Sequence, residues 1–248
     1  MKPLFLYLIL FSSTAFAQQV SISEIKLRPK PKFYNTREKT IIYPVISTGN
    51  RRTDALINAQ IKDECLSPDT ENQPLINTLK NKLNEGLTIL SYEVTLKNKG
   101  ILSINIFMEV CTAHLNSWTT YFNFDLKTGK SIRISDLVSA GKTDSLKAIV
   151  LRDKLKGIAA SKTEILDNLH SGDIDSSTYH WALEQIDDNC TKEASLDQFS
   201  LSANSITISD PCELSYAIRA LQPGYELKYT YKSIAAFLNT RFRKLFCK

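Results

Sequence analysis

Alternation of apolar and polar residues in the middle of the chain constrains its fold more than any other feature. The segments 87–98 and 100–111 repeat with a period of two, and the residues NKG at 98–100 between them favour a tight reversal. A third alternating segment, 117–126, leads into KTGK at 127–130, where the glycine permits a positive φ. These patterns predict an antiparallel β-meander of three consecutive strands, with one polar face and one aromatic face.

Helical periodicity appears on both sides of this meander. Apolar residues recur every three or four positions in 53–65 and 75–83, and again over about 143–186. The segment 40–47 is rich in β-branched residues and contains Pro44, which indicates an edge strand. Helices are therefore expected before and after the central strands.

The end of the chain predicts another strand-and-helix unit, with three short strands and a helix at 199–201, 206–208, 225–231 and 233–245. Strands followed by helices and then by further strands are typical of the α+β class rather than of a parallel sheet. We expect a single α+β domain over 40–248, in which the antiparallel β-meander packs with helices. It would carry a helical insertion at about 143–190 and a terminal strand–helix unit.

The first residues have the pattern of an export signal. Lys2 is followed by the apolar run 4–11 and by small residues flanking a phenylalanine at 15–17. The apolar run is shorter than the roughly 20 residues that span a bilayer, and no cysteine for lipid attachment follows it. We expect a signal peptide over 1–17 and an extended N-terminal arm over 18–39. The mature protein would then be periplasmic or secreted, without a lipid anchor or a membrane span.

The charged residues argue against a nucleic-acid partner. The chain has 31 basic and 26 acidic residues, which give a formal net charge of +5. The two signs are interspersed along the sequence. Such a balance favours solubility rather than binding to a phosphate backbone.

Five cysteines in an exported chain predict disulfides with one cysteine left over. The segment between Cys190 and Cys212 has the pattern of a strand hairpin whose ends meet, so this is the preferred pair. Cys65 with Cys111 is the second candidate pair. No two cysteines stand two to four residues apart and the three histidines are scattered, so no zinc pattern is present. We expect no metal and no other cofactor.

A set of polar residues and glycines spread over about 87–238 carries a family resemblance. Its members are Ala113-His114, Asn123, Asp125, Thr128-Gly129, Asp136-Leu137, Tyr216 and Gly224. In this pattern the chain resembles the extracytoplasmic domain family found in the lysozyme-sensing anti-sigma factor RsiV and in the non-catalytic region of the deacetylase PdaC. One departure is Cys111-Thr112, where the family usually has two glycines that allow close backbone approach.

The resemblance implies recognition rather than catalysis. We expect a secreted or periplasmic binding module without catalytic residues. Its ligand would be a protein, lysozyme-like proteins among them, or a cell-envelope polymer such as peptidoglycan. The oligomeric state does not follow from the sequence.

An alternative class is a cell-wall or carbohydrate-active hydrolase that uses Asp125, Asp136 and His114. Two carboxylates and a histidine can supply acid-base catalysis when they converge in one cleft. The local sequence favours structural roles instead, because Asp125 precedes a tight turn and Asp136 falls in the first turn of a helix, whose dipole favours a carboxylate.

The entrance to the third strand, CTAHLNSW at 111–118, is not explained by a turn or a helix cap. His114 stands there close to Asn116 and Trp118, and Tyr121 follows on the strand. Aromatic and amide side chains of this kind can line a groove for sugar or protein. We therefore take His114, Asn116, Trp118 and Tyr121 as the candidate binding residues.

Overall fold

A computed structural model describes residues 20–29, 40–66, 73–98, 100–224 and 226–247. The signal peptide expected over 1–17 lies outside the described residues.

The larger sheet contains the predicted meander. Its strand order is β1-β2-β3-β4-β5, with bounds Ser21–Leu27, Ile41–Ser47, Leu87–Asn98, Ile101–Cys111 and Leu115–Asp125. The three meander strands β3, β4 and β5 are antiparallel, as the alternation predicts. β2 meets β3 in parallel through the single register pair Ile41 and Leu90, so the sheet as a whole is mixed.

Strand β1 is an addition to the sequence prediction. It lies within the segment expected to be an extended arm, and it pairs antiparallel with β2 along the whole length of both strands. The expectation that 40–47 forms an edge strand is therefore wrong, because β2 lies between β1 and β3 and Pro44 is opposite Glu24.

Two helices cover one face of this sheet, α1 (Arg51–Leu66) and α2 (Leu75–Glu85). Their buried side chains, such as Ile57, Ile61 and Leu79, form one apolar core with the facing strand residues. Gly86 ends α2 in the left-handed conformation, with φ 111°.

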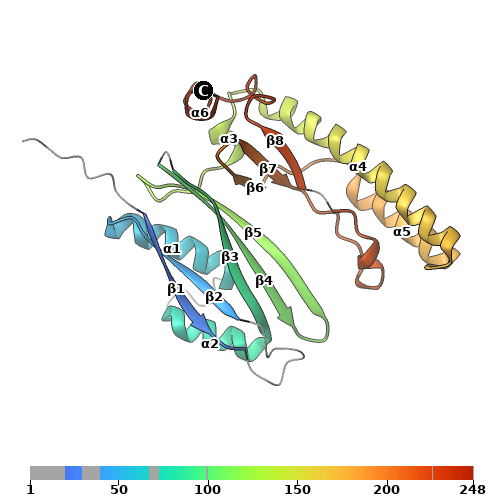
Figure 1. The fold of residues 1–248 in the computed structure, drawn as a ribbon, viewed down its shortest axis with the longest axis horizontal. Helices are drawn as coiled ribbons and strands as arrows, with labels where there is room; N and C mark the ends of the chain where they lie inside the picture. Colours follow the sequence, from blue (N-terminus) through green and yellow to red (C-terminus); the bar gives the residue numbers. More distant parts are fainter. Residues whose placement is uncertain (1–19, 30–39, 67–72, 99, 225, 248) are drawn as a thin grey trace, which may run out of the picture.

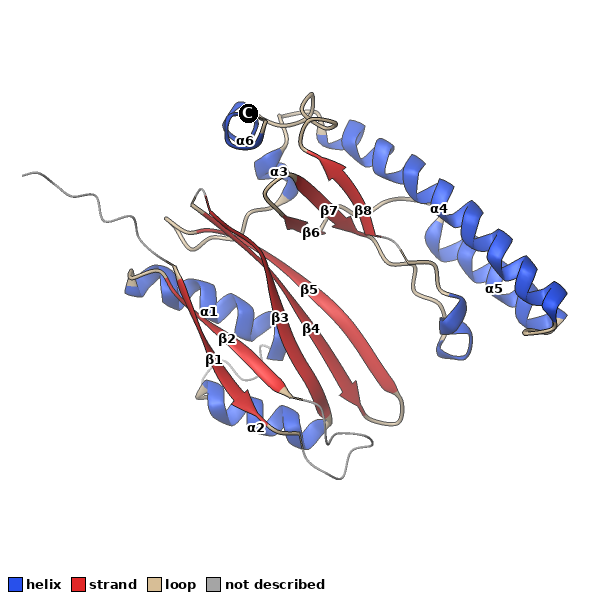
Figure 2. Cartoon of the chain, in the orientation of Figure 1, coloured by secondary structure: helices blue, strands red, loops and turns tan. Residues whose placement is uncertain are grey.

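The second half of the chain forms a separate layer on the other side of β5 (Figure 2). A small antiparallel sheet has the order β6-β7-β8, with bounds Gln198–Leu201, Ser205–Ser209 and Glu226–Thr230. The helical elements of this half are α3 (Ile134–Leu137), α4 (Thr143–Ser171), α5 (Ser176–Cys190), the 3-10 helix η2 (Tyr216–Leu221) and α6 (Thr240–Phe246). The long helices α4 and α5 run side by side as the outermost layer (Figure 1). They are the helical insertion that the sequence predicts.

The terminal helix begins later than predicted. Residues 231–237 form turns, and α6 starts at Thr240, where the Asn239 side chain accepts a hydrogen bond from the Phe242 amide. Tyr231, Ile234 and Leu238 are nevertheless buried in the core of this half. Their three-four spacing is that of a helix, which explains the wrong start.

Two buried hydrogen bonds join the sheets. The Asn123 side chain donates to the Phe199 carbonyl at 2.7 Å, and the Leu201 amide donates to Ser103 Oγ at 2.9 Å. The two sheets and their helices thus form a single α+β domain, which confirms the predicted class.

Candidate functional site

The N-terminal half of β5 lines a cleft of about 510 Å³. One wall comprises residues 115–119 and Tyr121, and the opposite wall comprises Ser209, Pro211, Glu213, Arg219 and Gln222. β5 is the last strand of its sheet, so this cleft lies along a sheet edge.

Three of the four candidate binding residues line this cleft. Asn116 accepts a hydrogen bond from Arg219 at 3.0 Å, and the Tyr121 hydroxyl donates to Glu226 at 3.0 Å. Trp118 is 43% exposed. The fourth residue, His114, lies in the turn before β5 and its ring stacks on Tyr216 with 4.2 Å between centroids. The structure therefore brings three of the four to one cleft, and it places His114 in the turn beside it.

The protonation of Tyr121 suits a hydrogen-bond donor. Partial burial raises the pKa of its phenol above the ordinary value, and Glu226 adds to this effect while a hydrogen bond with Ser209 opposes it. The hydroxyl consequently keeps its proton at neutral pH.

Sequence reasoning missed Arg219 as a functional residue. It lies one turn after Tyr216 in η2, and its guanidinium sits 5.6 Å from the centre of the Tyr216 ring. Tyr216 belongs to the family pattern, so an arginine three residues later on the same short helix was the available signal.

The wall opposite β5 is anchored to α5. The predicted disulfide between Cys190 and Cys212 is confirmed, with 5.1 Å between the Cα atoms. The Gln185 side chain donates to Ser215 Oγ and accepts from the Ser215 amide. These bonds fix the segment that carries Glu213 and Arg219.

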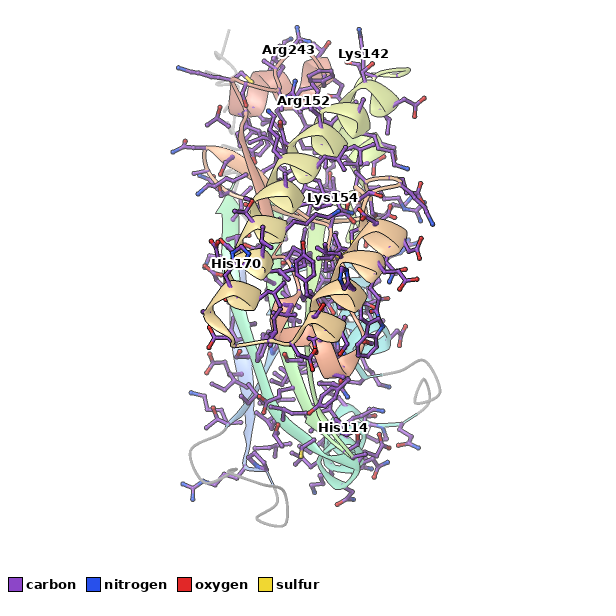
Figure 3. The ribbon with its side chains drawn as sticks, turned by 90° about the vertical axis from the view of Figure 1, so that its right-hand side faces the viewer. His114, Lys142, Arg152, Lys154, His170 and Arg243 are labelled. Carbon is purple, nitrogen blue, oxygen red and sulfur yellow. A yellow bond between two sulfur atoms is a disulfide. The ribbon has the colours of Figure 1, made fainter. Side chains whose placement is uncertain are left out.

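A buried ion pair anchors the start of the same wall. Lys154 of α4 is 3% exposed and donates to Asp210 at 2.7 Å and to the Glu193 carbonyl at 3.3 Å. Figure 3 shows Lys154 near the middle of the molecule. Asp210 directly precedes Pro211, so the ion pair holds both the end of β7 and the wall.

The second candidate disulfide is wrong, because Cys65 and Cys111 are both free thiols. Cys65 is buried at the end of α1, and burial, with Glu64 nearby, raises the pKa of its thiol to about 12. Cys111 ends β4 and is paired in register with Leu115 across the turn. The two cysteines thus lie at the ends of different elements, α1 and β4, and no disulfide joins them.

A smaller recess of about 290 Å³ continues along the same strand. It is lined by Thr120, Tyr121, Phe122 and Ser131, and by Gln60, Asp63 and Glu64 of α1. Tyr121 borders both recesses. Gly129 fixes the neighbouring turn against α1, because its carbonyl accepts from Gln60 at 2.9 Å and an added Cβ would lie 3.0 Å from the Thr53 carbonyl oxygen.

The residues of the hydrolase alternative do not converge. Asp125 ends β5 and Arg241 of α6 donates to it at 2.8 Å, whereas His114 lies before the first residue of the strand. At 3.3 Å per residue, an 11-residue strand separates the two by about 33 Å. Figure 3 accordingly places His114 at the opposite end of the molecule from Arg243, which is also in α6.

Asp136 has a helix-capping role. Its side chain accepts from the Arg133 amide at 2.8 Å at the start of α3. Within the part of the chain that the structure describes, no group of three or more metal-ligating side chains is gathered in one place.

Two solved structures share this fold. A DUF3298 family member from Bacteroides fragilis NCTC 9343 aligns with a TM-score of 0.59 at 15% identity, covering 92% of this chain and 98% of that one. A DUF3298 family protein from Pseudomonas aeruginosa PAO1 aligns with a TM-score of 0.50 at 13% identity, covering 90% and 95%. No protein-family model and no curated protein matches the sequence. The chain therefore has the α+β fold of this family of domains of unknown function.

Proposed function

We propose that this protein is an extracytoplasmic binding module that captures a protein or a cell-envelope polymer in the cleft beside β5. The observation that carries the proposal is the convergence of Asn116, Trp118 and Tyr121 on a cleft whose other wall carries Arg219. An exposed aromatic ring flanked by hydrogen-bonding groups is typical of binding hot spots.

The location outside the cytoplasm is supported by two features. The first residues match the pattern of a signal peptide, and Cys190 and Cys212 form a disulfide, which persists in oxidising compartments. Among the described residues, no helix is long and apolar enough to span a membrane.

A non-catalytic role is supported by the chemistry of the cleft. Its polar side chains are amides, hydroxyls, one carboxylate and one guanidinium, and they are not arranged as a nucleophile with an adjacent base. The resemblance to the RsiV and PdaC domains points the same way, and it makes lysozyme-like proteins and peptidoglycan the first ligands to test.

The test uses the chain from Gln18 onward, immobilised and incubated separately with a panel of lysozymes and with peptidoglycan. We expect Trp118→Ala to weaken retention of the bound ligand by about 30-fold, the size of a hot-spot residue. The matched control is Trp181→Ala, because Trp181 is 41% exposed on α5 and is not among the residues that line the cleft.

Two results would contradict the proposal. Equal losses of ligand binding in the Trp118 and Trp181 variants would show that the cleft is not the binding site. Turnover of peptidoglycan that His114→Ala abolishes would make the protein an enzyme.

A further inference from the structure

The outer edge of β5 is paired at one end by the protein's own backbone. The Asp125 amide donates to the Lys130 carbonyl at 3.0 Å, and Asn123 accepts from the Ile132 amide at 2.7 Å. These bonds show that residues 123 and 125 turn their amide groups away from β4.

Backbone direction alternates along a strand, so residues 121, 119 and 117 face the same outer edge. The Tyr121 amide donates a hydrogen bond to Gln198 Oε1 at 3.4 Å. The outward N–H and C=O groups of Ser117 and Thr119 form no hydrogen bond with any other described residue. Both residues instead border the cleft. A row of unpaired groups on an edge strand is a template for another strand.

The charges around this edge favour a basic ligand. Asp63 and Glu64 lie on the α1 side, and Glu213 lies on the opposite wall. Arg219 is the single cation among the described residues that line the two recesses, and its guanidinium is bonded to Asn116. The lining therefore has three carboxylates and one guanidinium. This excess of negative charge would attract lysine and arginine side chains.

We propose that the cleft binds its ligand as an extended, basic segment of a partner protein, which adds a strand to the edge of β5 at Ser117 and Thr119. This inference rests on the proposed function and specifies its mode. Main-chain hydrogen bonds supply the affinity in such complexes, and alternate side chains supply the specificity. A second copy of this chain is a poorer occupant, because β5 would bring the same carboxylates against each other.

The test uses a peptide of about seven residues, near the usual strand length, that alternates lysine and valine. Its affinity for the full chain is measured by calorimetry beside two related peptides. One has every backbone amide N-methylated, so that it cannot donate. The other carries glutamate in place of lysine. We expect both changes to weaken binding by about tenfold or more.

Protein variants locate the interaction on β5. Thr119→Pro removes the outward N–H and leaves the ladder to β4 intact, which an edge strand tolerates. We expect it to weaken binding of the unmodified peptide by about tenfold, whereas the control Thr119→Val, which keeps the N–H, changes it less than about twofold. Ser117→Pro is the second variant, and circular dichroism of each confirms folding.

Three outcomes would overturn strand addition. Equal binding of the plain and N-methylated peptides would show recognition by side chains alone. Failure of every peptide, with ligand retention still lost in Trp118→Ala, would exclude an extended basic ligand and leave the proposed function standing. A concentration-dependent dimer that Thr119→Pro abolishes would identify the occupant as a second copy.

Discussion

Asp125 organises the turn that follows β5. One carboxylate oxygen accepts from the amides of Lys127 and Thr128 at 3.0 and 3.1 Å, and the other accepts from Arg241 at 2.8 Å. Partial burial pushes the pKa of Asp125 upward, but the bonds from Arg241, Thr128 and Lys127 outweigh it and hold the pKa below its ordinary value.

This pKa shift predicts a pH-dependent effect of Asp125→Asn. The charged form is favoured in the folded state, so its stabilisation is present above about pH 4 and is lost as the pH falls through the lowered pKa. We expect Asp125→Asn to reduce the free energy of unfolding by about 1 kcal/mol at pH 7. Urea unfolding at pH 7 and at acidic pH checks this, and a difference that stays constant with pH would contradict it.

At the same scale, sequence reasoning succeeded where the chemistry was local. The turn role of Asp125 and the capping role of Asp136 depend on neighbours within three residues. The hydrogen bond between Arg219 and Asn116 was not predictable, because the two residues are 103 positions apart in the sequence. Contacts of that range depend on tertiary structure, which no local pattern encodes.

Among the elements, α5 determines where the cleft wall lies. It is joined to the wall by the disulfide at Cys212 and by Gln185 through Ser215. The wall itself has little regular structure apart from η2. The disulfide and the Gln185 hydrogen bonds therefore hold it in place, as backbone hydrogen bonds would hold a strand in a sheet.

Removing the disulfide should therefore affect both stability and binding. A bond that closes a loop of 22 residues stabilises a fold by about 3 kcal/mol through the entropy of the unfolded chain. We expect the double variant Cys190→Ser, Cys212→Ser to unfold at a lower temperature and to bind cleft ligands more weakly. Calorimetric melting and the retention assay measure the two effects, and Cys65→Ser is not a suitable control because Cys65 is buried in the core.

The informative control is Cys247→Ser, since this thiol is half-buried and outside the disulfide. A melting temperature lowered equally in this control would contradict the assigned role of the bridge.

Elements with strong periodicity were predictable, namely the meander, α2 and the α4–α5 pair. Strand β1 was not, because β2 begins at Ile41, 14 positions after β1 ends at Leu27, which is too far apart for the short turn signal of a hairpin. The start of α6 was misplaced because core residues at helical spacing occur in a run of turns.

For the molecule as a whole, two buried hydrogen bonds and a shared apolar core form a junction between the two sheets. Ser103 and Asn123 are buried there, and each bonds a backbone group of β6. The class and the single domain were predictable from the order of elements, but this junction joins residues 76 and 98 positions apart.

Breaking this junction should uncouple the small sheet. Asn123→Ala leaves the buried Phe199 carbonyl without its donor, which costs about 2 kcal/mol. We expect amide hydrogen exchange to accelerate in β6 to β8 more than in β3 and β4. Ser117→Ala, on an exposed part of the same strand, should leave exchange unchanged. Uniform acceleration across both sheets would contradict the assignment of Asn123 to the junction.

The position of Trp118 also makes the protein its own optical probe. The chain has two tryptophans, one bordering the cleft and Trp181 exposed on α5. With Trp181 replaced by phenylalanine, all remaining indole fluorescence would come from the cleft. Binding of a ligand at the β5 edge would then change the emission maximum and the quenching of this single tryptophan, so no attached label would be needed.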